Sequence, residues 1–179
     1  MDSNHLDELK TPAADETRKA VEPCSIVIFG ASGDLTARKL IPALYHLHKE
    51  KQMPAKYRVI GFARREKTDA SWRQELRQAL DQFSRTKPVD DKVWQEFSAN
   101  IFYCEGEFSD LSAYQKLGKM LDSFRDEQLK NNLLLYLATS PSQFGEVVEQ
   151  LNKARLLHKQ QDKGWQRIVV EKPFGHDLA

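Results

Sequence analysis

The sequence predicts an α/β fold with a doubly wound, mainly parallel sheet and helices on both of its faces. Three observations predict this fold. From residue 24 onward, short apolar segments alternate with longer segments of helical period. The first apolar segment runs directly into a turn that contains glycines and then into a helical pattern. The length of 179 residues suits one domain with its own core.

The first half of the chain supplies two strands and two helices. Residues 24–29 are predicted as a buried strand, because their apolar residues follow one another without the alternation of a half-exposed strand. A helix is expected over 34–50, with a kink or local break at Pro42, which lacks a backbone donor. Residues 57–62 form the second predicted strand. A helix follows, marked by apolar residues at helical spacing: Trp72, Leu76, Ala79, Leu80 and Phe83.

The second half repeats this alternation. After a break at Lys87-Pro88, a short helix around Trp94 precedes a third strand over 101–104. Further helices are predicted over 111–124 and 144–151, and further strands over 133–138 and 165–170. This order of elements is Rossmann-like. Right-handed crossovers then bring the ligand-binding loops to the carboxyl ends of the strands.

We expect one domain over 23–179, preceded by a frayed tail over 1–22. That tail is rich in acidic residues and has no apolar core of a secretory signal, so a cytoplasmic location is expected. The 27 basic and 26 acidic residues leave a net charge of +1, which argues against nucleic acid or an anionic membrane as a partner. Cys24 and Cys104 are expected to be buried thiols, because neither has the spacing of a zinc site and two cysteines make no disulfide framework.

The turn after the first strand is the first functional clue. Gly30 and Gly33 stand between a buried strand and a helix, where a tight turn and close backbone approach favour a pyrophosphate at the helix N-terminus. The spacing departs from G-x-G-x-x-G, because Ala31 and Ser32 separate the glycines and Thr36 stands at the third small position. A glycine turn without a ligand is the alternative. A phosphate-binding P-loop fits less well, because no Gly-Lys-Ser/Thr follows.

The end of the second strand favours NADP over NAD. An acidic residue there commonly holds the ribose diol of NAD, whereas a 2′-phosphate needs cationic donors. Here the strand runs into Arg64 and Arg65, and Arg64 together with Ser32 could bind the 2′-phosphate. Two alternatives remain: both arginines are solvated loop charges, or the nearby Glu66 holds a ribose diol.

Three motifs in this order resemble glucose-6-phosphate dehydrogenases: Gly30-Ala-Ser-Gly-Asp-Leu-Thr-Ala-Arg-Lys-Leu-Ile-Pro42, Gly61-Phe-Ala-Arg64 and Glu171-Lys-Pro-Phe-Gly-His-Asp-Leu178. The resemblance extends over 25–179 and covers only the amino-terminal coenzyme domain of that family. It implies a Rossmann fold that binds NADP. It also implies an oxidoreductase of the pentose phosphate pathway that oxidises glucose 6-phosphate at C1 to 6-phosphogluconolactone and transfers a hydride to NADP.

The resemblance also implies roles for single residues. It places the pyrophosphate and ribose beside the first motif, that is, beside Gly30, Ala31, Ser32, Gly33, Asp34, Leu35 and Thr36. It places the 2′-phosphate on Arg64, and Tyr136, Ala138 and Phe144 near the coenzyme. Lys172 is implied to contact both glucose 6-phosphate and the nicotinamide end of the coenzyme. Its position directly after an apolar strand agrees with this role, although an ion pair with Glu171 or Asp177 is the alternative.

No catalytic residue is expected in this chain. The substrate-binding motif and catalytic histidine of the family have no match here, and we do not assign the role of base to any of the five histidines: His5, His46, His48, His158 and His176. We therefore expect the chain alone to bind NADP without turnover. The resemblance implies that the full-length enzyme is a homo-oligomer. For this piece alone, a monomer is one alternative and association through an exposed apolar face is the other.

Two other classes of protein remain as alternatives. A short-chain dehydrogenase also begins with a strand, a glycine loop and a helix, but Tyr45 and Lys49 lie in the first helix and so in the wrong place for its Tyr-x-x-x-Lys pair. A non-catalytic module that senses dinucleotides or binds a protein partner is the other.

Overall fold

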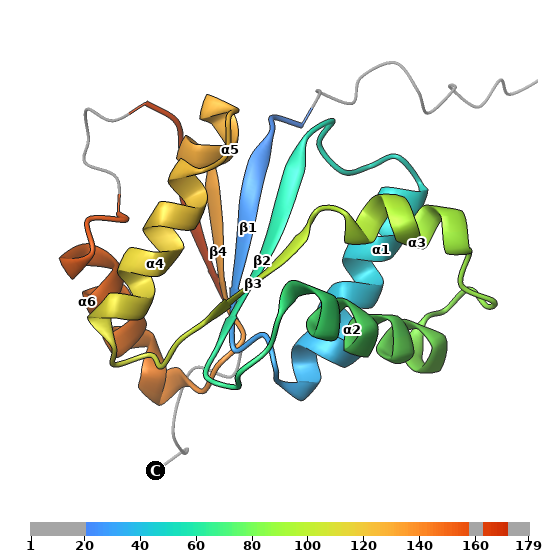
Figure 1. Cartoon of the computed structure of the whole chain (residues 1–179), viewed down its shortest axis with the longest axis horizontal. Helices are drawn as coiled ribbons and strands as arrows, with labels where there is room; N and C mark the ends of the chain where they lie inside the picture. Colours follow the sequence, from blue (N-terminus) through green and yellow to red (C-terminus); the bar gives the residue numbers. More distant parts are fainter. Residues whose placement is uncertain (1–20, 158–162, 172–179) are drawn as a thin grey trace, which may run out of the picture.

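The computed structural model describes residues 21–157 and 163–171. It contains a five-stranded sheet made of β1 (Cys24–Phe29), β2 (Tyr57–Ala63), β3 (Ile101–Glu105), β4 (Leu133–Leu137) and β5 (Gln166–Val170). All neighbouring strands are parallel, and their order is β3-β2-β1-β4-β5 (Figure 1). The predicted doubly wound α/β fold is therefore confirmed. All six residues of β1 are buried, as expected for a central strand covered on both faces.

The helices cover the two faces of this sheet (Figure 1). Their bounds are α1 (Ile41–Lys49), α2 (Asp69–Phe83), α3 (Asp91–Ser98), α4 (Leu111–Asp122), α5 (Glu127–Asn131) and α6 (Phe144–Lys153). A first core cluster joins Ile26 and Ile28 of β1 to Tyr45 of α1 and Trp72 of α2. A second cluster lies on the other face of the sheet, beneath α4 and α6. The side chains of β1 alternate between these clusters because successive residues of a strand point to opposite faces.

The predicted helix over 34–50 divides into two parts. A π-helical segment, Thr36–Leu40, leads into α1, and Pro42 occupies the first turn of α1. Proline is tolerated there because the N–H groups of a helix start lack intrahelical acceptors. The N–H of Ile41 instead donates to the Thr36 carbonyl, five residues back. The expected break at Pro42 is thus a change of helix type.

The other elements differ from the predicted ranges at their ends. β2 and β3 each extend one residue further, β4 ends one residue earlier, and β5 begins at Gln166. The sequence analysis missed α5 and a short 3₁₀ turn, Pro141–Gln143. Most of the tail predicted over 1–22 lies outside the described residues. Both cysteines are buried free thiols, as predicted.

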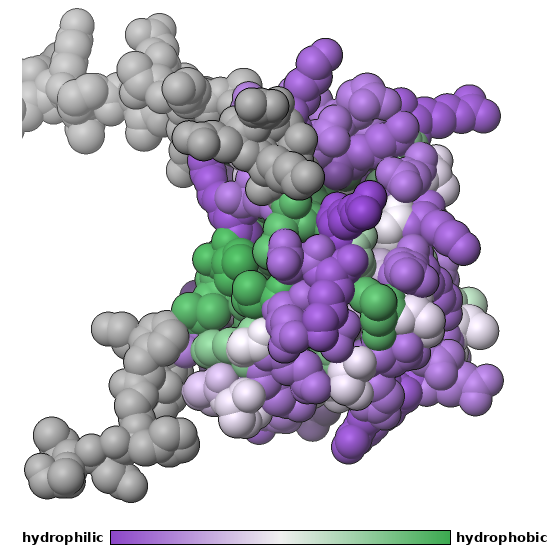
Figure 2. Space-filling view, turned by 90° about the vertical axis from the view of Figure 1, so that its left-hand side faces the viewer, coloured by the Kyte–Doolittle hydropathy of each residue, from purple (hydrophilic) through white to green (hydrophobic). Residues whose placement is uncertain are grey.

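The edge strand β5 is less covered than the central strands. Ile168 of β5 is 45% exposed, whereas each hydrophobic residue of β1 is at most 6% exposed. Figure 2, which faces the side of α4, α5 and α6, shows a hydrophobic area within a surface that is otherwise mostly hydrophilic. Across the described ranges, no helix is long and apolar enough to cross a membrane.

Candidate functional site

The glycine turn after β1 is closed tightly against the sheet. Gly30 has a φ of +87°, and a Cβ there would lie 2.4 Å from the carbonyl oxygen of Ala138. Glycine is therefore required at this position both for its backbone conformation and for space. The N–H of Gly33 donates to the Gly30 carbonyl at 2.9 Å, and the buried Thr36 hydroxyl donates to the same oxygen at 3.3 Å. This hydroxyl contact explains how Thr36 is accommodated at the third small position.

Some N–H groups of this turn donate to the sheet, and only the others can donate to a ligand in the cavity. Those of Gly30 and Ala31 both donate to the Phe62 carbonyl, at 2.9 and 3.3 Å. They are thus used within the protein. The Ala31 side chain is buried and packs beside Gly61 of β2, where a Cβ would come within 2.7 Å of it. Backbone donors for a ligand must instead come from the helix start that follows, where no side chain caps the first N–H groups, although the N–H of Ala37 already donates to the Gly33 carbonyl at 3.3 Å.

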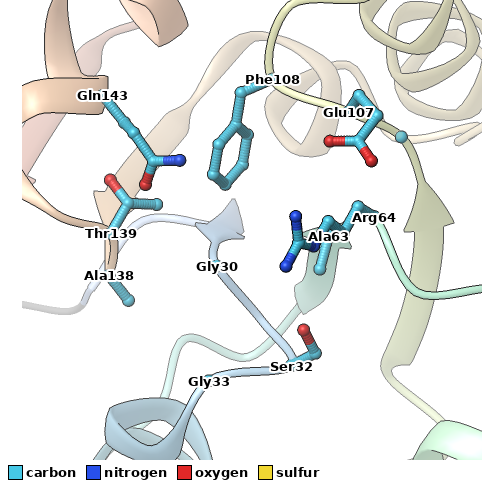
Figure 3. A pocket seen from close by; sticks show the side chains of 11 residues that line it. Gly30, Ser32, Gly33, Ala63, Arg64, Glu107, Phe108, Ala138, Thr139 and Gln143 are labelled. Atoms are coloured by element: carbon cyan, nitrogen blue, oxygen red, sulfur yellow. The ribbon is translucent and has the colours of Figure 1, made fainter.

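A cavity of about 270 Å³ opens above this turn, at the carboxyl ends of β1, β2, β3 and β4. Because β1 lies between β2 and β4, the chain winds in opposite directions from this point, and parallel α/β sheets bind ligands at such a crevice. The residues that line it are Gly30, Ser32, Gly33, Ala63, Arg64, Gly106, Glu107, Phe108, Ala138, Thr139 and Gln143 (Figure 3).

Arg64 gives this cavity its positive charge. Its guanidinium extends from the end of β2 toward the turn that carries Ser32 (Figure 3). In the part of the chain that the structure describes, no carboxylate lies within ion-pair distance of it. Arg77, by contrast, contacts Asp81 at 3.2 Å and Asp91 at 2.6 Å. Arg64 is thus a cation left available for an anion that enters the cavity.

The structure brings together five of the residues named from the sequence: Gly30, Ser32, Gly33, Arg64 and Ala138 all line the cavity. Five others form its support or lie near it. Ala31 and Thr36 are buried beneath the turn, and Asp34 is exposed and forms an ion pair with Arg38 at 3.3 Å. Leu35 is half-buried at the helix start. Phe144 packs against the second core cluster.

Tyr136, in β4, does not line the cavity but contacts Glu171, the residue that follows β5. Its side chain packs against the first core cluster, and its hydroxyl donates to the carboxylate of Glu171. Burial and the negative charge of Glu171 raise the pKa of Tyr136 to about 12, so the phenol stays protonated at neutral pH. Glu171 is the last described residue before Lys172, which itself lies outside the described residues.

Six lining residues were missed by the sequence analysis: Ala63, Gly106, Glu107, Phe108, Thr139 and Gln143. Figure 3 shows the Phe108 ring and the Gln143 amide pointing into the space opposite the turn. Their common signal is a place at or after the carboxyl end of a strand. Ala63 is the last residue of β2, and Gly106 to Phe108 follow β3 directly. Thr139 lies two residues after β4, and Gln143 ends the 3₁₀ turn that comes next. The rule that ligands bind beyond the carboxyl ends of parallel strands could have found them.

Comparison with known proteins links this geometry to one family. The family model described as "Glucose-6-phosphate dehydrogenase, NAD binding domain" matches residues 27–179. The chain is 47% identical to glucose-6-phosphate 1-dehydrogenase of Chlamydia pneumoniae over 159 residues, which are 87% of this chain and 31% of that protein. The enzyme of Bacillus subtilis is 35% identical over 154 residues, which are 86% of this chain and 30% of that protein.

Solved structures agree with the sequence matches. A glucose-6-phosphate dehydrogenase in complex with its substrate glucose 6-phosphate superposes with a TM-score of 0.76 at 32% identity, over 90% of this chain and 33% of that one. Glucose-6-phosphate 1-dehydrogenase from Mycobacterium avium gives a TM-score of 0.71 at 33% identity, over 86% of this chain and 30% of that one. The chain thus spans about a third of the length of these relatives.

Proposed function

The chain belongs to the glucose-6-phosphate dehydrogenase family, whose NAD-binding domain it matches, and on this basis we propose that it binds NADP in the cavity beside Arg64. We further propose that it is the coenzyme-binding part of an enzyme that oxidises glucose 6-phosphate at C1 and transfers a hydride to NADP. The product of that reaction is 6-phosphogluconolactone. The single observation that carries the proposal is that the glycine turn and the guanidinium of Arg64, which forms no ion pair with any described residue, line the same cavity.

The donors around the cavity fit a phosphorylated dinucleotide. A pyrophosphate suits the uncapped helix start that follows the turn, because N–H groups and the helix dipole there favour anions. Because Gly30 has no Cβ, the turn can close against the carbonyl of Ala138, and both residues line the cavity. Arg64 and the Ser32 hydroxyl reach the same space and suit the 2′-phosphate that distinguishes NADP from NAD.

Phe108 and Arg64 favour the adenosine end of the coenzyme in this cavity. The aromatic ring of Phe108 offers an apolar face against which a planar adenine can pack. The volume of about 270 Å³ is slightly below the ~300 Å³ at the lower limit for small-molecule sites, so the cavity suits one part of a dinucleotide, and the charge of Arg64 favours the adenosine end, which carries the 2′-phosphate. The nicotinamide, which accepts the hydride when NADP is bound, would then extend toward β4 and β5.

Lys172 is proposed to contact glucose 6-phosphate and the nicotinamide end, on the basis of its motif in the sequence. The end of β5 supports this proposal, because Glu171 is held to Tyr136 at the carboxyl edge of the sheet. We assign no catalytic base to this chain, so the chain alone is expected to bind coenzyme without turnover. The complete enzyme is proposed to act in the cytoplasm as a homo-oligomer, in keeping with the family resemblance.

The test is coenzyme binding by the wild-type chain and by Arg64→Ala, measured by titration calorimetry with NADP and with NAD. A charge-assisted hydrogen bond contributes about 1.5–3 kcal/mol, so the loss of the guanidinium should weaken NADP binding roughly 10- to 100-fold. NAD binding should change less than about threefold, because NAD carries no 2′-phosphate.

Arg65→Ala is the matched control. Arg65 is an exposed neighbour whose side chain does not line the cavity, while its backbone carbonyl accepts a hydrogen bond from Tyr103 at 2.6 Å. Removal of this side chain should leave both affinities within about threefold of wild type. If Arg64→Ala retains the full affinity for NADP, the assignment of the 2′-phosphate to Arg64 is wrong.

A further inference from the structure

Glu107 is placed at the cavity by the loop that follows β3. β2 and β3 pair in parallel up to Ala63 and Glu105, and the N–H of Gly106 then donates to the Ala63 carbonyl at 3.0 Å. The N–H of Asp110 donates to the Glu107 carbonyl at 3.2 Å and closes a turn. These two bonds hold the backbone of Glu107 beside the end of β2, from which Arg64 emerges.

Gly106 makes this close approach possible. A Cβ at Gly106 would lie 2.2 Å from the Cβ of Ala113 in α4 and 2.9 Å from the Phe62 ring. Only glycine therefore lets the loop pass between α4 and β2. The position of Glu107 is a consequence of core packing and of the sheet register.

Glu107 and Arg64 are the charged side chains that line the cavity within the described residues. Figure 3 shows the carboxylate and the guanidinium entering the space from the same side, each from the segment that follows its strand, β3 and β2 respectively. No ion pair within 4.0 Å joins them in the described residues. Glu66, which the sequence suggested as an acceptor for a ribose diol, does not line this cavity.

We propose that Glu107 is a specificity-determining residue that reduces the factor by which this site prefers NADP over NAD. This proposal rests on the proposed function. An ionised carboxylate only accepts hydrogen bonds, so it suits the 2′- and 3′-hydroxyls of the adenosine ribose of NAD. The same carboxylate repels the 2′-phosphate of NADP, which Arg64 attracts. The cavity thus contains a guanidinium, on Arg64, that favours NADP and a carboxylate, on Glu107, that favours NAD.

The experiment measures dissociation constants for NADP and NAD with the wild-type chain and Glu107→Gln, which keeps the shape of the side chain and removes its charge. We expect NADP to bind about 3- to 10-fold tighter and NAD about threefold weaker, so that the ratio of the two constants rises roughly 10-fold or more. The gain for NADP should shrink between about 20 mM and about 300 mM salt, because exposed charges are screened.

Two other acidic residues serve as controls with the same change of charge. Glu66→Gln and Glu105→Gln remove carboxylates near the cavity that do not line it. Neither variant should change the ratio more than about twofold.

The outcomes separate this inference from the proposed function. If Glu107→Gln leaves the ratio within about twofold of wild type while Arg64→Ala weakens NADP, the inference is overturned and the proposed function stands. If all three carboxylate variants shift the ratio equally, bulk charge explains it and the inference is again overturned. If the wild-type chain binds neither coenzyme, both the proposed function and this inference fail.

Discussion

Substitution of Gly30 by alanine should destabilise the whole domain. A non-glycine residue in the left-handed region costs about 1–2 kcal/mol, and Gly30 has a φ of +87°. The added methyl group would lie 2.4 Å from the carbonyl oxygen of Ala138, which is backbone and cannot rotate away. Overpacking of this kind costs about 1–3 kcal/mol, so the free energy of unfolding should fall by about 2–5 kcal/mol.

Urea denaturation measures this loss. With a slope of about 2 kcal/mol per molar, the midpoint for Gly30→Ala should fall by about 1–2.5 M. Coenzyme binding should weaken as well, because the turn must move relative to the end of β4 to relieve the contact. Circular dichroism at each urea concentration follows the unfolding, and calorimetry with NADP follows the binding.

Two other glycines give a graded comparison. A Cβ at Gly33 would lie 3.0 Å from the Gly30 carbonyl oxygen, so Gly33→Ala should cost less than Gly30→Ala. A Cβ at Gly145, in α6, meets nothing within 4 Å, so Gly145→Ala should leave stability unchanged or raise it by up to about 1 kcal/mol. A loss below about 1 kcal/mol for Gly30→Ala, or an equal loss at Gly145, would refute the reasoning.

Two further substitutions test the packing and the pH dependence. Gly61→Ala would place a Cβ 2.4 Å from the Trp72 ring, so urea denaturation should show a loss of about 1–3 kcal/mol; an unchanged midpoint would contradict the close contact. Burial lowers the pKa of His48, opposed by the charge of Glu96, and its ring is 2.9 Å from the Tyr57 hydroxyl. The unfolded state therefore binds the proton more readily, and stability should fall as the pH drops from about 6.5 toward the lowered value. His48→Gln should reduce this slope in urea titrations at successive pH values, and an identical slope would exclude His48 as its source.

The sequence predicted those residues of the site that can be recognised from the pattern of their own segment of chain. Gly30, Gly33 and Arg64 were found because each follows a strand that its own apolar residues reveal. Strand, turn and helix signals are local, so their order along the chain implies a crevice even before the strand order is known.

The neighbours across the cavity were not predictable in the same way. Phe108 and Gln143 lie in segments with no unusual composition, and they meet only because β3 and β4 lie on opposite sides of the β2-β1 pair. The acidic residue that lines the cavity together with Arg64 was not predictable from the sequence either. The sequence raised Glu66 as the acidic alternative beside Arg64, whereas the acid that lines the cavity is Glu107, from the loop that follows β3.

The sequence by itself determined the α/β class, the glycine turn and the cation at the end of β2, because periodicity and turn chemistry act over a few residues. The tertiary structure decided which distant side chains close the cavity and how Pro42 is accommodated. It also decided that the N–H groups of Gly30 and Ala31 donate to the carbonyl of Phe62. These two N–H groups are therefore not available to a ligand, which must use N–H groups of the helix start. These features depend on which strands become neighbours, and that choice is made by the burial of whole faces of the sheet in two cores.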